Sequence, residues 1–226
     1  MHKINLSFVV LLALFIALPA KAQVKLGVIG GINIANLNGE DEDRTKIDFS
    51  SRTGFGIGGV LDLPMSTNVA LHVEPMYLQK GAEFDLSDQD LGTAKATVKA
   101  AYLEVPVFVK VALGSSTARP YLMAGPTIGF NLSSTFGLSA AGLNAEMDAN
   151  PVIKSTDFGL GFGAGVDIPI GANTFFVEGR YALGLSDVAE AGTFELMGEQ
   201  LQVDNANVKT NGIQIMAGIS FPLGGK

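Results

Sequence analysis

Residues 102–111 read Tyr-Leu-Glu-Val-Pro-Val-Phe-Val-Lys-Val. Every second residue from Leu103 onward is Leu or Val, whereas the positions between them include Glu104 and Lys110. Because successive side chains of a β-strand point to opposite faces, the stretch predicts a strand with one apolar face and one mixed face. The alternation extends over residues 98–113. It is therefore long enough for the roughly 9–11 residues that a tilted membrane-spanning strand needs.

The same alternation recurs in seven other stretches of the chain. The predicted strands are residues 25–35, 53–63, 69–83, 98–113, 119–130, 157–168, 174–185 and 210–223. The connections are alternately long and short: 37–52, 84–97, 131–156 and 186–209 are long, and 64–68, 114–118 and 169–173 are short. This rhythm predicts an all-β fold, an eight-stranded antiparallel up-and-down β-barrel. In outer-membrane barrels the short turns are periplasmic and the long loops extracellular.

The mixed face indicates which side of each strand faces the membrane. It holds mostly glycine, as at Gly159, Gly161, Gly163 and Gly165, together with isolated charges of both signs. A soluble, lipocalin-like barrel would turn its apolar face inward and cover its outside with Lys and Glu. Small residues and sparse charges instead fit a narrow lumen, because eight strands leave an interior just wide enough for side chains. We therefore expect a transmembrane barrel whose apolar face is outside.

The N-terminus has the three parts of a secretory signal peptide. Lys3 supplies a positive charge, an apolar region covers residues 6–18, and Ala20-Lys21-Ala22 matches an A-x-A cleavage site. Cleavage is expected between Ala22 and Gln23, which divides the chain into a signal peptide, residues 1–22, and a barrel domain, residues 23–226. The expected location is the outer membrane.

The composition excludes several classes of protein. The chain has no Cys, which removes disulfides and thiolate metal sites. Its net charge is −7 and becomes more negative if the signal peptide is cleaved, so it has no electrostatic footprint for nucleic acid. After the signal peptide no apolar run reaches the ~18 residues of a spanning helix. Most acidic residues fall in the long connections, where solvation accounts for them.

Six charged residues are predicted to face the lumen and to form an ionic network. They are Glu74, Lys80, Glu104, Lys110, Glu178 and Arg180. Arg180 is expected near mid-depth, reaching across to Glu74, to Glu104 or to both, because a buried charge is costly unless it is paired. Such a network could be a gate or a proton path. We expect a structural plug that fills the interior.

Three weaker signals point to other chemistry. His72 has Ser66 as the nearest suggestive nucleophile, as a lipid-hydrolysing barrel would require. Gly54, Gly56 and Gly59 match a dinucleotide fingerprint, but they lie within a predicted strand rather than before a helix. The acidic residues Glu40, Asp41, Glu42, Asp43, Asp85, Asp88 and Asp90 could offer Ca²⁺ ligands, without EF-hand spacing. We expect no catalytic, cofactor or metal site. The prolines Pro75, Pro106, Pro120 and Pro126 are expected to cause β-bulges.

Two segments resemble a known family. Residues 74–81, Glu-Pro-Met-Tyr-Leu-Gln-Lys-Gly, and residues 102–107, Tyr-Leu-Glu-Val-Pro-Val, are similar to the PorT-like outer-membrane β-barrel family of Bacteroidetes. The resemblance extends over the mature chain and implies a barrel inserted by the outer-membrane assembly machinery. That machinery reads a last strand ending in an aromatic residue, here Phe221, although five residues follow it. The founding member of the family is implicated in a protein secretion system.

The sequence as a whole predicts a non-enzymatic outer-membrane barrel with a plugged lumen, whose long acidic loops serve surface interaction. The alternative is an accessory subunit of an outer-membrane secretion or transport machine. A lipid-modifying enzyme and a small pore are further alternatives. The expected partners are outer-membrane lipid, the assembly machinery and secretion-system components, with no cofactor and no nucleic acid.

Overall fold

The computed structural model describes residues 23–40, 46–47, 49–85, 94–114, 117–140, 143–196, 199–203 and 207–223. The predicted signal peptide and its cleavage site are therefore outside the described residues. The barrel wall consists of β1 (Lys25–Glu40), β3 (Ser50–Pro64), β4 (Val69–Val73), β5 (Met76–Asp85), β6 (Ala94–Ala112), β7 (Arg119–Ala140), β9 (Thr156–Ile170), β10 (Asn173–Gly184) and β13 (Asn207–Pro222). Among the described residues, no helix is long and apolar enough to cross a membrane.

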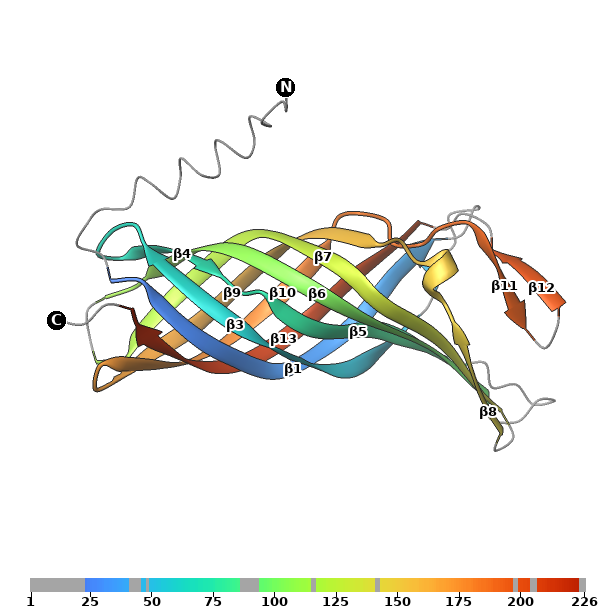
Figure 1. Cartoon of the computed structure of the whole chain (residues 1–226), viewed down its shortest axis with the longest axis horizontal. Helices are drawn as coiled ribbons and strands as arrows, with labels where there is room; N and C mark the ends of the chain where they lie inside the picture. The colour runs from blue at the N-terminus through green and yellow to red at the C-terminus, as the bar shows by residue number, and fades with distance from the viewer. Residues whose placement is uncertain are drawn as a thin grey trace, which may run out of the picture.

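These strands close into a barrel in which every neighbouring pair is antiparallel. β1 pairs with β3 on one side and with β13 on the other, so the first and last strands complete the ring. β4 and β5 together occupy one place in the wall, because both pair with β3 and with β6. The ring therefore has eight positions. This confirms the predicted eight-stranded up-and-down barrel (Figure 1).

The expected bulges at proline are wrong. Between β4 and β5, Glu74 and Pro75 leave the ladder, yet the register with β6 is the same before and after them. The register also continues unchanged past Pro106, Pro120 and Pro126. A missing N–H removes one rung, whereas the proline carbonyl still accepts a hydrogen bond, as Pro75 O does from Gly59 N at 2.9 Å. The register shift of β6 lies instead between Ala101 and Tyr102.

The two ends of the barrel differ in their connections. Three short turns lie at one end, here called the short-turn end, where β1 begins and β13 finishes (Figure 1). The other end, the long-loop end, carries β2 (Lys46–Ile47), β8 (Leu143–Asp148), the 3₁₀ turn η1 (Asn150–Val152), β11 (Gly192–Leu196) and β12 (Glu199–Val203). β6 and β7 extend beyond the predicted strands, and β8 pairs with the end of β7. Much of the predicted loop 131–156 is therefore ordered β-structure.

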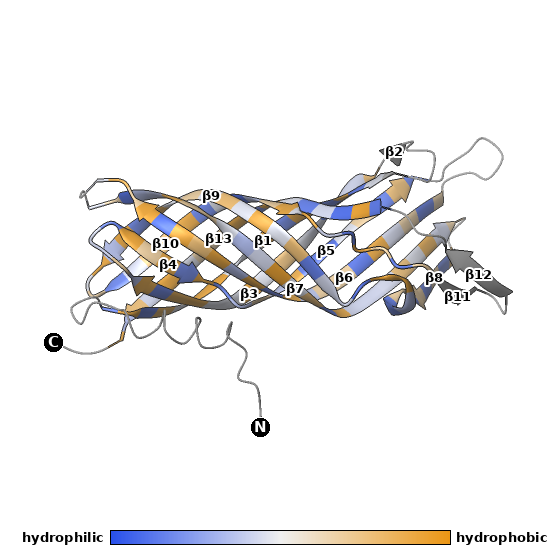
Figure 2. Cartoon of the chain, turned by 90° about the horizontal axis from the view of Figure 1, so that it is seen from above, coloured by the Kyte–Doolittle hydropathy of each residue, from blue (hydrophilic) through white to orange (hydrophobic). Residues whose placement is uncertain are grey.

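The two faces of the wall divide by polarity as the alternation predicts. Large apolar side chains on the outer face are exposed, among them Val28, Ile57, Val109, Leu122, Phe158 and Ile213. Figure 2 shows apolar and polar residues alternating along the strands. The lumen holds a small apolar cluster of Ile29, Val60, Met76, Leu78, Phe176 and Met216 together with buried charged groups. Gly54, Gly56 and Gly59 lie within β3, so no helix follows that glycine pattern.

Candidate functional site: the ionic network in the lumen

Arg180 lies at the centre of the lumen and contacts strands from both sides of the barrel. Its guanidinium Nη1 forms an ion pair with Glu74, which lies between β4 and β5, and another with Glu178 Oε1 at 3.2 Å. Its Nε donates to the side-chain oxygen of Gln214 on β13. Because all four side chains are at most 4% exposed, these are contacts without water on either side. The lumen is thus bridged across its width.

His72 continues this cluster toward the short-turn end. Its Nδ1 lies 2.5 Å from Asp62 Oδ1, and its Nε2 lies 2.6 Å from Glu74 Oε1. The ring is completely buried. Only the protonated imidazole has two N–H donors, so this geometry fits an imidazolium between two carboxylates. Asp62, His72, Glu74, Arg180 and Glu178 therefore form one connected chain of alternating charge.

Tyr121 on β7 ends the chain on the opposite wall. Its hydroxyl donates to Glu178 Oε2 at 2.7 Å. The ring lies against Gly165 of β9, where an added Cβ would overlap the phenol, so only glycine leaves room for it. On the other side of the ring, Lys110 Nζ lies 3.9 Å from the centroid and forms an ion pair with Asp167 at 2.9 Å. The cation–π contact couples this pair to the central cluster.

A second charged layer lies nearer the long-loop end. Lys80 Nζ is 2.5 Å from Glu104 Oε2 and 3.0 Å from Asp157 Oδ2, and all three side chains are buried. Thr210 Oγ1 donates to the same oxygen of Asp157 at 2.7 Å. The Lys80 ammonium also lies 5.0 Å from the centroid of the Tyr102 ring. This second layer joins β5, β6, β9 and β13.

The structure buries all six residues of the predicted network. Arg180 contacts Glu74, as expected, but Glu104 lies in the second layer with Lys80 and not on Arg180. Sequence reasoning missed His72, Asp157 and Asp167 as network members. The alternation of residues 157–168 already put both aspartates on the inner face, because their neighbours Phe158 and Ile168 point outward. Their strand-end positions made them look like loop residues.

The described lumen has no space for a metal ion at its most plausible ligands. Ligand atoms of His72, Glu74 and Glu178 lie within 4.8 Å of one another. The Arg180 guanidinium already lies between the two glutamates, and the second ring nitrogen of His72 is used by Asp62. A positive side chain therefore holds the position that a cation would take. The acidic positions 41–43, 88 and 90 are outside the described residues.

The pairing of His72 with Ser66 is not present. Ser66 lies in the exposed turn after β3, where its hydroxyl accepts a hydrogen bond from Val69 N at 3.2 Å. Both nitrogens of His72 face carboxylates. A nucleophile-activating histidine needs one nitrogen free to accept a proton from a hydroxyl. This geometry gives His72 no such hydroxyl.

Two ionised groups outside the spanning part tie the long-loop end together. Burial opposes ionisation of Asp187, but the hydrogen bond from Lys154, at 2.8 Å, and those from Val208 N and Ala189 N outweigh it and lower the pKa of Asp187. A hydrogen bond from Lys99 lowers the pKa of Glu146 on β8. Phe221, the predicted assembly signal, lies on the outer face of β13 near the short-turn end.

Comparisons with known proteins agree with this architecture. A family model described as an outer membrane protein beta-barrel domain matches residues 19–190. Among solved structures, the outer membrane protein OprG from Pseudomonas aeruginosa aligns with a TM-score of 0.52 at 12% identity, covering 88% of this chain and 96% of OprG. At that identity the likeness shows the fold alone. No curated protein matches the chain.

Two further solved structures are more distant. The outer membrane protease OmpT from Escherichia coli aligns at 10% identity with a TM-score of 0.47, covering 92% of this chain and all of OmpT. Ail, the attachment invasion locus protein of Yersinia pestis, was solved with the heparin analogue sucrose octasulfate. It aligns at 15% identity with a TM-score of 0.42, covering 88% of this chain and 99% of Ail.

Proposed function

The chain belongs to the outer membrane protein beta-barrel domain family, and on that premise we propose that it is a non-enzymatic, non-conducting barrel whose long-loop end recognises partners at the cell surface. Within the family we place it among the PorT-like barrels, on the segments 74–81 and 102–107. The long-loop end would face the exterior, since outer-membrane barrels carry their long loops there. Both ends of the chain would then lie in the periplasm.

One observation carries the proposal: the connected ionic cluster from Asp62 through Arg180 to Tyr121 that fills the lumen at mid-depth. Water and solutes would have to break several buried ion pairs to pass. Removing one partner of such a pair is strongly unfavourable because it leaves a buried charge uncompensated. An eight-stranded barrel has no spare width to bypass the cluster, since its interior is only wide enough for side chains.

The non-conducting part is tested in planar lipid bilayers with the purified barrel. The wild-type protein is expected to give no stepwise conductance above the bare bilayer. The Arg180→Ala variant removes the central group of the cluster, and Arg119→Ala, at an exposed position of β7, is the matched control. Steady single-channel steps from the wild-type protein, unchanged in Arg180→Ala, would establish a pore and contradict the proposal.

The partner-recognising part is tested by purification from native outer membranes. The tagged full-length protein is extracted in mild detergent, and co-purifying proteins are identified by mass spectrometry. Recovery of the barrel alone, as a compact folded species, supports a stand-alone surface protein whose ligands are sought at the long-loop end. Stoichiometric recovery of secretion or transport components would replace this reading with that of a machine subunit.

A further inference from the structure

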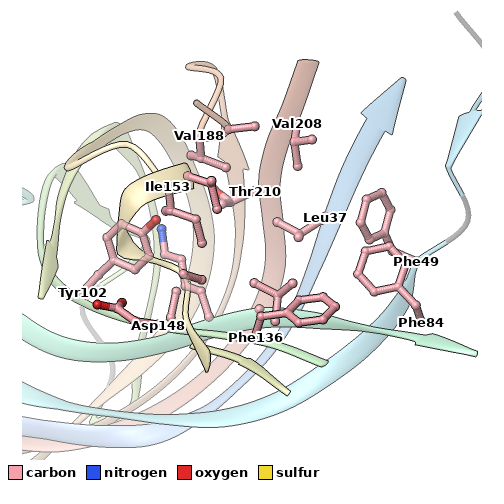
Figure 3. Close-up of a pocket in the computed structure, with 17 residues that line it drawn as sticks. Leu37, Phe49, Phe84, Tyr102, Phe136, Asp148, Ile153, Val188, Val208 and Thr210 are labelled. Atoms are coloured by element: carbon pink, nitrogen blue, oxygen red, sulfur yellow. The ribbon is translucent and has the colours of Figure 1, made fainter. Parts of the chain in front are cut away.

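A cavity of about 360 Å³ lies inside the long-loop end of the barrel, separate from the ionic cluster around Arg180. Its floor includes Lys80 and Tyr102 of the second charged layer. Its sides are side chains of β1, β5, β6, β7 and β13, among them Leu37, Phe84 and Phe136 (Figure 3). Its outer boundary is formed by residues 148–154 and 187–190, here called the cap.

The cap is tied to itself and to the barrel by backbone hydrogen bonds. Lys154 N donates to Val188 O at 2.9 Å, Glu190 N donates to Val152 O at 2.9 Å, and Ile153 forms a bridge with Ala189. These contacts join the two halves of the cap. Val188 N also donates to Val208 O on β13 at 2.8 Å. The outer wall of the cavity is thus built before any ligand arrives.

A second set of contacts fastens the cap to β7. Ala149 N donates to Ser134 O at 2.9 Å, and Ser134 N donates to Asn150 Oδ1 at 2.7 Å. Such reciprocal bonds fix η1 over the barrel mouth. Because these bonds need no ligand, binding would not have to order the cap, which favours affinity.

The lining offers hydrocarbon and almost no free polar groups. In Figure 3 the side chains of Val188, Ile153 and Val208 share the cavity with Leu37 and Phe136. Its polar members among the described residues have partners elsewhere. Lys80 is paired with Glu104 and Asp157, Thr210 donates to Asp157, and Asp148 accepts from Asn150 N. A charged ligand would lose its hydration here without gaining a counter-charge.

We propose that this cavity is a binding site for an uncharged, apolar small molecule roughly twice the size of benzene. The volume sets the size, since an apolar protein cavity of ~150 Å³ stays dry and takes up benzene. It also lies within the ~300–1,000 Å³ typical of small-molecule sites. The aromatic pair of Phe49 and Phe84, with ring centroids 4.5 Å apart, gives one side of the cavity flat surfaces that suit an aromatic guest.

The test measures binding of 1-fluoronaphthalene to the full-length barrel in lipid nanodiscs by ¹⁹F NMR. The wild-type protein should give a saturable bound signal of one ligand per barrel. Val188→Phe adds bulk inside the cavity and should weaken binding at least tenfold. Val177→Phe makes the same change on the outer face of β10 and should leave binding unchanged, with circular dichroism showing that both variants are folded.

Two additional measurements decide the cavity assignment and the ligand class. Ala100→Leu fills the cavity from β6 rather than from the cap, so it tests the same site if Val188→Phe fails to fold. 1-Naphthoate should bind at least tenfold more weakly than the neutral probe. Equal binding of the neutral probe to wild type and the filled variants, no saturable signal, or preference for naphthoate would overturn the proposal. The bilayer result for the closed lumen stands independently of these outcomes.

Discussion

Arg180 on β10 and Glu74, between β4 and β5, form a buried ion pair across the lumen although they are 106 residues apart in the sequence. The contact joins opposite walls of the barrel at a point where β4 and β5 lose their continuous ladder. Glu74 shares a second contact with His72, and Arg180 shares one with Glu178. The pair therefore belongs to a cluster whose members depend on one another.

Replacing Arg180 by Leu is expected to lower the free energy of unfolding by about 3–5 kcal/mol, because Glu74 and Glu178 would remain buried without their shared positive charge. Urea unfolding of the purified barrel measures the change. Arg119→Leu, an exposed position on β7, is the control and should shift the midpoint little. An unchanged midpoint in Arg180→Leu would show that the cluster does not stabilise the fold.

Removing Lys80 should expose the same logic in the second layer. Lys80→Met leaves Glu104 and Asp157 facing each other without a cation and is expected to destabilise the barrel by about 3–5 kcal/mol. The combined variant Lys80→Met with Glu104→Gln should be more stable than Lys80→Met alone, since it removes one uncompensated charge. Thermal unfolding followed by circular dichroism compares them, and Lys95→Met, an exposed lysine, is the control.

His72→Ala is expected to destabilise the barrel, since Asp62 and Glu74 each lose a hydrogen-bond donor in a dry interior. Each hydrogen bond to a charged group contributes about 1.5–3 kcal/mol. His72→Gln keeps one donor and should fall between the alanine variant and the wild type. If both variants unfold at the wild-type urea concentration, the imidazole is not part of the supporting network.

The contribution of Asp187 to stability should depend on pH in a defined direction. Its pKa is lowered in the folded state, so its stabilisation is present above the unfolded-state pKa, about 3.9, and is lost as the pH falls through the lower folded-state value. Hydrogen exchange of the Ala189 and Val208 amides should therefore be faster in Asp187→Asn than in wild type above about pH 5. The difference should vanish in strong acid. A difference that persists there would assign the effect to packing.

The outward apolar face predicts a depth-dependent penalty for charge. Leu103→Arg places a cation on the outer face beside mid-depth Glu104 and should cost about 2–4 kcal/mol in a bilayer. Leu143→Arg lies on β8, beyond the barrel wall, and should be nearly neutral. Equilibrium folding into lipid vesicles measures both. Equal stability of the two variants would mean that Leu103 does not face lipid.

Strand alternation was sufficient to predict the barrel, because side-chain direction in a strand follows directly from residue order. It predicted the eight strands and buried all six charges of the predicted network. It also contained the inward positions of Asp157 and Asp167, which were missed because they end their strand. The bulges expected at proline failed because a local rule about one N–H does not determine how a closed ladder adjusts.

The sequence by itself determined the strand count, the antiparallel order and the face on which each charge lies, since all three depend on residues close together in the chain. Only the tertiary structure decided which charges meet. Arg180 could reach Glu74 or Glu104 by alternation alone, and the stagger between strands, which sets the height of each residue in the barrel, gave Glu104 to Lys80. The cavity was also decided there, because the two halves of its cap come from loops that are distant in sequence.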